Sequence, residues 1–322
     1  MNHEPRTKNP EPGSAGNQEP RLVRRSIGEG GTNNGEPSPL PLTVYTPDTG
    51  LKDPRALFAG IWRDMFAHQS RELAWRLTVR TLAGQFRQSL LGYFWLFFPP
   101  LLNSVVFIFL QRQQILKMEE TAIPYAVFVL LGNLLWQAFM LSIQSPIKAV
   151  QRELSILTKL NISREAVLLS GFYEMLITSA IPFVALPLIL LVFGIPFSTV
   201  MLLGPVGFLG FVIFGFAIGV WLTPIGLLYR DIGQAIPILL RFMMFVTPVV
   251  YPVPKEPGLA RTVLLLNPTT PFVETARDWM TGQSAELIGP FLVLSALSLV
   301  VLLVGLVVYR LAMPIIIERM SA

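Results

Sequence analysis

The stretch IGPFLVLSALSLVVLLVGLVVYRLA, residues 288–312, decides the fold class, because Arg310 is its only charged side chain. A run of this length can cross the hydrocarbon core of a bilayer as a helix, which takes about 20 residues. Similar runs recur along the chain of 322 residues, of which 52% are hydrophobic and only 14% charged. Soluble domains carry about 25% charge, and the mean hydropathy here is +0.55. The sequence therefore predicts an all-α, polytopic membrane protein.

Six apolar runs are predicted to be transmembrane helices. They lie at about 91–111, 124–146, 166–193, 199–223, 233–252 and 288–312. Lys and Arg gather before the first run, between the second and third, after the fourth and in the C-terminal tail. The positive-inside rule places these segments, and with them both termini, in the cytoplasm.

The region before the first span divides into two parts. Residues 1–50 are rich in Pro, Gly, Asn and Glu, and we expect a disordered cytoplasmic tail. Residues 51–92 are expected to form interfacial helices, since two stripes run along 71–92 at helical spacing. The apolar stripe is Trp75, Val79, Leu82, Phe86 and Leu90, and the basic stripe is Arg76, Arg80 and Arg87. This pattern is typical of a helix in the headgroup plane, although an amphipathic helix packed on protein gives the same pattern.

Two charged residues lie well inside predicted spans, Glu174 in the third and Arg241 in the fifth. Each is about 12 Å from the cytoplasmic start of its span at 1.5 Å per residue. Because an unpaired charge at depth is costly, we expect these two residues to pair or to face water. A structural ion pair and a polar path for substrate both remain open.

Residues 148–165 (KAVQRELSILTKLNISRE) connect the second and third spans. They predict a short amphipathic helix at about 150–161, with Val150, Leu154 and Leu157 on one face and Arg152 and Glu153 elsewhere. Such a helix suits docking of a cytoplasmic partner, or it is a plain connector.

Motifs for catalysis and nucleotide binding are not found. There is no Gly-Lys pair and therefore no GxxxxGK[ST] phosphate loop. Cys is absent and only two His occur, which argues against a disulfide framework and a metal site. We expect no catalytic residues and no cofactor in this chain, so active transport would draw its energy from a separate subunit or an ion gradient. The net charge of +5 is assigned to membrane topology rather than to nucleic acid.

Six motifs, in order, resemble those of bacterial ABC exporter permeases for polysaccharides, the type-two permeases of O-antigen, capsule and teichoic acid. They are RTLAGQFRQSLLGYFW (80–95), FVLLGNLLWQAF (128–139), KLNISREAVLLSG (159–171), LLYRDIGQAIPILLRFMMFVTPVVYP (227–252), LLNPTTPFVETARDWM (265–280) and VYRLAMPIIIERM (308–320). The chain departs from the family pattern at Thr81, Gln85 and Ile162-Ser163, where the family has an Asp, a basic residue and Phe-Pro.

The resemblance implies a homodimer of six-span subunits in the bacterial inner membrane, bound to two ATP-binding subunits that hold ATP and Mg. The first and fifth spans would line a channel for a lipid-linked polysaccharide, surrounded by membrane lipids. The outer segment at about 253–286 would re-enter the membrane as two short apolar runs broken at Asn267-Pro268.

The resemblance also implies roles for particular residues. The ATPase-coupling residues would be Arg152, Glu153, Leu154, Leu157, Arg230, Asp231 and Glu318. The gate through which substrate enters would use Arg76, Arg80, Phe86 and Arg87. The channel lining would include Trp95, Phe97, Phe98, Arg241, Phe242, Phe245 and Tyr251.

The predicted function is therefore the permease subunit of an ATP-driven exporter of a lipid-linked polysaccharide. A type-two permease for a small lipid or drug is an alternative, and its channel would lack aromatic lining. A membrane-embedded glycosyltransferase or acyltransferase would need an acidic or His site at the membrane surface. An ion channel would need filter-like rings in an oligomer.

Overall fold

The computed structural model describes residues 60, 63–65, 67–87, 90–115, 120–157 and 162–321, with the backbone alone at Phe86, Arg230, Met320 and Ser321. Every regular element in these ranges is a helix. In chain order the elements are α2 (His68–Phe86), η2 (Gly92–Leu96), α3 (Phe98–Arg112), α4 (Tyr125–Leu157), α5 (Arg164–Ala180), η3 (Ile181–Ala185), α6 (Leu186–Val192), η4 (Thr199–Leu203), α7 (Gly204–Leu228), α8 (Arg230–Met243), η5 (Met244–Val246), α9 (Leu259–Leu266), α10 (Thr270–Met280) and α11 (Ile288–Ser321). The predicted tail at 1–50 and the helical part predicted before residue 60 lie outside the described residues.

Within the described residues, four helical stretches are long and apolar enough to cross a membrane. They are Tyr125–Leu157, Arg164–Val192, Thr199–Leu228 and Ile288–Arg319. These coincide with the second, third, fourth and sixth predicted spans. The predicted first and fifth spans are helical but shorter, since α3 has 15 residues and α8 has 14.

Several predicted boundaries shift. The helix expected at about 150–161 is not a separate element, because α4 continues without interruption to Leu157. The third span is one helical stretch interrupted by η3, where Pro182 and Pro187 stand at the starts of η3 and α6. Proline cannot donate to the preceding turn, which explains the change of helix type at these points. The surface helix predicted over 71–92 ends earlier, at Phe86.

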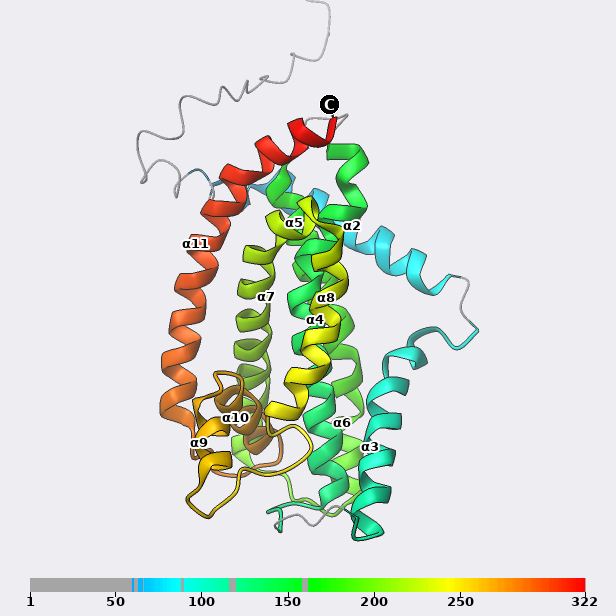
Figure 1. The fold of residues 1–322 in the computed structure, drawn as a ribbon. Helices are drawn as coiled ribbons and strands as arrows, with labels where there is room; N and C mark the ends of the chain where they lie inside the picture. The colour runs from blue at the N-terminus through cyan, green and yellow to red at the C-terminus, as the bar shows by residue number, and fades with distance from the viewer. Residues whose placement is uncertain are drawn as a thin grey trace, which may run out of the picture. The chain divides into compact units, whose positions relative to one another are not determined.

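Close contact between α4 and α7 forms the centre of the bundle, and α11 packs on the other side of α7 (Figure 1). A Cβ atom at Gly215 would lie 1.9 Å from Oγ of Ser142, and one at Gly219 would lie 2.3 Å from the carbonyl oxygen of Ile143. Small residues let helix backbones approach each other closely in a membrane, where van der Waals packing and interhelical hydrogen bonds hold them together. The glycines of α7 therefore set the spacing of the bundle.

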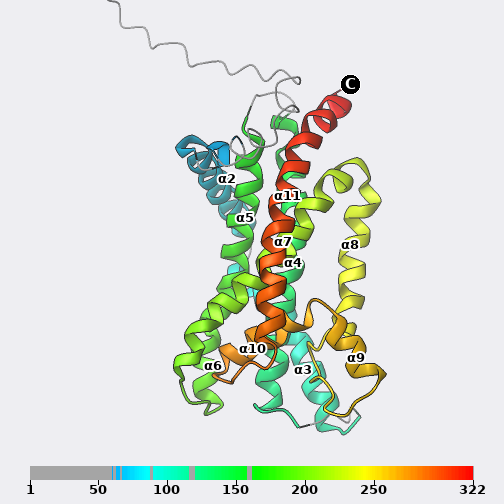
Figure 2. The same cartoon turned by 90° about the vertical axis from the view of Figure 1, so that its left-hand side faces the viewer.

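The surface helix α2 lies across the bundle near the end that carries the C-terminus, and both views agree on this position (Figures 1 and 2). It packs on α5 through Ala74 and Thr78, which are buried, whereas Trp75 and Val79 are about half exposed. Trp75 nevertheless meets Tyr173 of α5 edge-on, with ring centroids 6.4 Å apart, so the predicted apolar stripe is only partly free of the protein. The interpretation of α2 as an interfacial helix stays a prediction.

The opposite end of the bundle carries the hairpin of α9 and α10 (Figure 2). Asn267 ends α9, so the break falls at the predicted Asn267-Pro268. Its side-chain amide donates to the carbonyl oxygen of Val246 at 2.9 Å, and its oxygen accepts from the backbone N–H of Thr269 at 3.0 Å. The hydroxyls of Thr247 and Thr269 are 2.9 Å apart. These bonds tie the chain that follows α8 to the hairpin.

Arg277 of α10 contacts both the chain that follows η5 and helix α4 at this end of the bundle. Its guanidinium donates to the carbonyl oxygens of Pro248 and Val249 at 2.7 and 3.1 Å and to Glu274 at 2.9 Å, and it lies 3.7 Å from the ring centroid of Phe128 on α4. The side chain is only 2% exposed. Burial raises the pKa of Glu274, and the nearby charge of Arg277 opposes this shift.

We predict that Gly132→Ala disrupts the hairpin end of the bundle. The added Cβ would lie 2.0 Å from the carbonyl oxygen of Val249 and 2.9 Å from Nη2 of Arg277, and overpacking of this kind costs about 1–3 kcal/mol or more. Thermal unfolding of the purified protein in detergent measures the loss. Gly289→Ala is the matched control, because open space surrounds its Cβ position. Equal melting temperatures for the two variants would contradict the close contact at Gly132.

Candidate functional site

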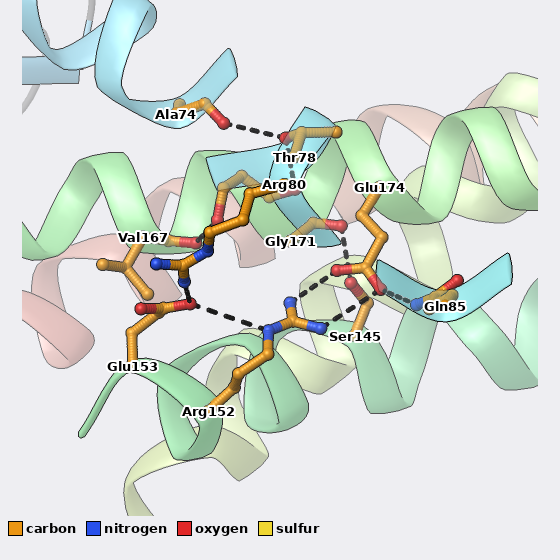
Figure 3. A network of polar contacts seen from close by, with 11 residues as sticks. Ala74, Thr78, Arg80, Gln85, Ser145, Arg152, Glu153, Val167, Gly171 and Glu174 are labelled. Atoms are coloured by element: carbon orange, nitrogen blue, oxygen red, sulfur yellow. Dashed lines mark hydrogen bonds and ion pairs between the residues drawn. The ribbon is translucent and has the colours of Figure 1, made fainter. Parts of the chain in front are cut away.

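A network of charged and amide side chains joins α2, α4 and α5 (Figure 3). Arg80 of α2 pairs with Glu153 of α4. The neighbouring Arg152 donates to both carboxylate oxygens of Glu174 on α5, at 2.5 and 3.3 Å, and its Nε lies 3.8 Å from Glu153. Gln85 of α2 donates to Glu174 at 2.6 Å. We call these five residues the α2 network.

Burial explains why the α2 network forms. The side chains of Glu153 and Glu174 are only 4% and 16% exposed, whereas Arg80 is 56% exposed. A carboxylate removed from water is costly unless a cation and hydrogen-bond donors surround it. Two buried carboxylates on α4 and α5 thus require cations, and one of the two that meet this need comes from α2. The α2 network therefore fixes a surface helix to two spans.

Hydrogen bonds to backbone carbonyls reinforce the same contact. The Thr78 hydroxyl on α2 donates to the carbonyl oxygens of Ala74 and of Ser170 on α5, at 2.8 and 3.2 Å. The Ser145 hydroxyl on α4 donates to the carbonyl oxygen of Gly171 at 2.6 Å. A Cβ at Gly171 would be 2.7 Å from the Cβ of Ala149, so α4 and α5 touch closely beside the α2 network.

The predicted pairing of Glu174 with Arg241 is wrong within this chain. Glu174 faces α4 and α2 and is held by Arg152 and Gln85. Arg241 lies on α8, which packs on α4 and α7, whereas α5 packs on α4 and α2. Its side chain is exposed and makes no ion pair with any described residue. The prediction rested on similar depth along the two spans, but the two side chains lie on different sides of α4.

The predicted coupling residues fall into two groups. Arg152 and Glu153 belong to the α2 network, and Leu157 is buried at the end of α4. Asp231 is exposed in the first turn of α8, and Glu318 is exposed near the end of α11. Leu154 is half-buried, and the Arg230 side chain lies outside the described residues.

The predicted gate residues separate in a similar way. Arg80 belongs to the α2 network, whereas Arg76 pairs with Glu72 of the same helix at 2.5 Å. Arg87 is exposed just after α2. The side chain of Phe86 lies outside the described residues.

The predicted channel residues lie on η2, α3 and the region of α8 and η5. Trp95 packs edge-on against Phe98 with ring centroids 5.3 Å apart, and Phe97 is half-buried beside them. Phe242 and Phe245 are 67% and 57% exposed. The Tyr251 hydroxyl donates to the carbonyl oxygen of Phe245 at 2.5 Å. The role of these seven residues, Arg241 included, stays a prediction.

Sequence reasoning missed several members of the site. Gln85 was noted only as a departure from a basic residue, yet it donates to Glu174. Arg310 was given no role, yet its guanidinium forms a second ionic link, 2.8 Å from the carboxylate of Asp64 and 3.5 Å from that of Glu165. Ser163, where the family has Pro, caps α5 by accepting from the backbone N–H of Ala166. A lone charge in a span was the signal available for Arg310.

The fold and the α2 network define a polytopic helical membrane protein whose surface helix is anchored to its spans by charge. The sequence model of the ABC-2 type transporter family matches residues 72–281. The chain belongs to this family and is therefore a transport subunit.

Curated relatives agree with this assignment. The O-antigen export system permease protein RfbA of Myxococcus xanthus is 28% identical over 242 residues, which are 73% of this chain and 90% of the relative. Two proteins of Klebsiella pneumoniae with the same description are 24% and 25% identical, each over 64% of this chain and 79% of the relative.

We predict that exchanging the charges of Arg152 and Glu174 restores the yield and thermal stability of folded protein that each single variant loses. Arg152→Glu and Glu174→Arg each place like charges together, whereas the double variant re-forms the pair and recovers about 0.5–3 kcal/mol. The yield of monodisperse protein and its melting temperature in detergent measure the effect. Arg241→Glu combined with Glu174→Arg is the control and should give no rescue. Rescue by that control alone would contradict the pairing described here.

Proposed function

We propose that this chain is the membrane-spanning permease subunit of an ATP-driven exporter that moves a lipid-linked polysaccharide across the bacterial inner membrane. The observation that carries the proposal is the similarity to three O-antigen export permeases, one of which is matched over 90% of its length. The ABC-2 type match to residues 72–281 supports the same mechanism class.

In this proposal α3 and α8, with η2 and η5, complete six crossings. The exposed face of α8 supports this, because Asp231, Gln234 and Arg241 all lie on exposed positions of one short helix. A charge facing lipid is expensive, and intramembrane charges face a water-filled cavity or a partner helix. A second copy of the chain would enclose the exposed faces of α3 and α8 as a channel, with Trp95 and Phe242 among its lining residues.

The end of the bundle that carries the α2 network would be cytoplasmic, as would both termini. The Lys and Arg residues of the sequence gather in the connections at this end, which supports this orientation through the positive-inside rule. Two copies of an ATP-binding subunit, holding ATP and Mg, would dock here against Arg152, Glu153 and Asp231. The α2 network would then pass their motion to α2. The hairpin of α9 and α10 would re-enter the membrane from the outside.

Deleting the gene from its host tests the proposal. We expect loss of surface polysaccharide and accumulation of the lipid-linked polymer on the cytoplasmic side, both restored by the wild-type gene. Unchanged surface polysaccharide in the deletion strain would overturn the proposed function. Export of a small lipid or drug in place of the polymer would support the alternative type-two permease.

We predict that Asp231→Lys lowers export several-fold while the protein stays in the membrane. Reversing an exposed charge in the first turn of α8 would disturb docking of the ATP-binding subunit without removing a buried contact. Surface polysaccharide and the amount of membrane-inserted protein are measured together. Glu256→Lys, the same reversal at an exposed residue before α9, is the control and should export normally. Normal export by Asp231→Lys would count against an interface role for this residue.

A further inference from the structure

A groove with a volume of about 470 Å³ lies between α4 and α8, beside the end of α7. Four long polar side chains line it: Gln144, Lys148 and Gln151 from α4 and Gln234 from α8. The three α4 residues are spaced four and three apart, so they share one face of the helix. No carboxylate lines the groove. Apolar side chains such as Ile147 and Ile236 complete its wall.

Within the described residues, no carboxylate forms an ion pair with the ammonium group of Lys148. Its ammonium makes no ion pair or hydrogen bond with a described residue, and its side chain is exposed toward the groove. Glu174 is close enough to act on this charge, but its carboxylate is already held by Arg152 and Gln85. A lysine at this level of α4 with no such partner is free to serve a ligand or to face water.

The glutamine amides add donors around the ammonium. Gln151 donates one N–H to the carbonyl oxygen of Gly226 at 3.3 Å, and Gln144 donates one to that of Met140 at 3.1 Å. Each amide has a second N–H, so these bonds orient the groups without exhausting them. An ammonium and several amide groups that line one groove without a carboxylate suit an anion with several acceptor oxygens.

In the proposed orientation, the groove lies close to the level of the surface helix α2 along α4. Arg80 of the surface helix pairs with Glu153, so Glu153 marks the level of α2 along α4. Lys148 is a little over one turn nearer the middle of α4, about 7 Å at 1.5 Å per residue. A phosphate on a lipid in the same leaflet can reach that level, and the apolar wall suits the first part of its chain.

We propose that the groove between α4 and α8 binds the phosphate or diphosphate through which a glycan is joined to its lipid carrier. Lys148 supplies the charge, and Gln151 and Gln234 donate hydrogen bonds. This inference rests on the proposed export function and adds a binding site to it. The headgroup of a bulk phospholipid carries the same chemistry, so the experiment must separate the two sources.

The test measures binding of a long-chain polyprenyl diphosphate, and of the polyprenol of equal length, to the full-length protein in phosphatidylcholine nanodiscs. Native mass spectrometry or thermophoresis reports both affinities. We expect Lys148→Met to weaken diphosphate binding at least ten-fold and to leave polyprenol binding unchanged, whereas Lys148→Arg stays within about three-fold of wild type, since charge-assisted hydrogen bonds carry the affinity. Lys255→Met, at an exposed lysine before α9, is the matched control and should bind as wild type.

Other outcomes would overturn the proposal. If Lys148→Met binds the diphosphate with wild-type affinity, the proposed site is refuted. An equal loss of affinity for diphosphate and polyprenol in the folded variant would also refute it. If Lys148→Met does not fold, Gln234→Leu takes its place, with an expected loss of a few-fold for the diphosphate alone. Displacement of the diphosphate by an equal amount of phosphatidylglycerol would assign the groove to bulk lipid. Because the deletion experiment reads surface polysaccharide, it decides the export function independently of this site.

Discussion

The pairing of two buried carboxylates with arginines is the constraint on which the arrangement of this protein depends. Glu153 and Glu174 sit on adjoining helices at one end of the bundle, and neither is tolerable there without a cation. Arg152 satisfies one of them from α4 itself. The other is satisfied by Arg80, which comes from outside the spans. The position of α2 is therefore fixed by charge as well as by the packing of Ala74 and Thr78 on α5.

The opposite end of the bundle uses the same principle for a different element. Arg277 ties the hairpin to the chain that follows α8 and to Phe128 on α4. Both sets of contacts therefore involve α4. The contact of Arg277 lies near the first turn of this helix, and the Arg80–Glu153 pair lies near its last turn. Because α4 is continuous from Tyr125 to Leu157, it is the common reference for the surface helix at one end and the hairpin at the other. Its close contact with α7 through glycine makes that reference rigid.

Sequence alone predicted the features that depend on order along the chain. Run length and hydropathy located the four long spans. The Asn267-Pro268 break located the hairpin turn. Both signals depend only on residues that are neighbours in the sequence. The partner of Glu174 was not predictable in this way. Depth can be read from distance along a span, but rotation about the helix axis and the identity of neighbouring helices cannot. Arg277 was missed for a related reason, since its partners at 248–249 are backbone carbonyls that carry no residue-type signal.

The groove and the α2 network share charged groups on one stretch of α4. Lys148 and Arg152 are one turn apart, and Glu174 is bound by the second while it acts on the first. An anion held by Lys148 would repel Glu174 and compete with it for Arg152. Because Glu174 also accepts from Gln85 of α2, a change at Glu174 would reach one of the contacts that hold that helix, beside the Arg80–Glu153 pair and the Thr78 bond to Ser170. Any such coupling would be reciprocal, so the state of α2 would act on anion binding in the same measure.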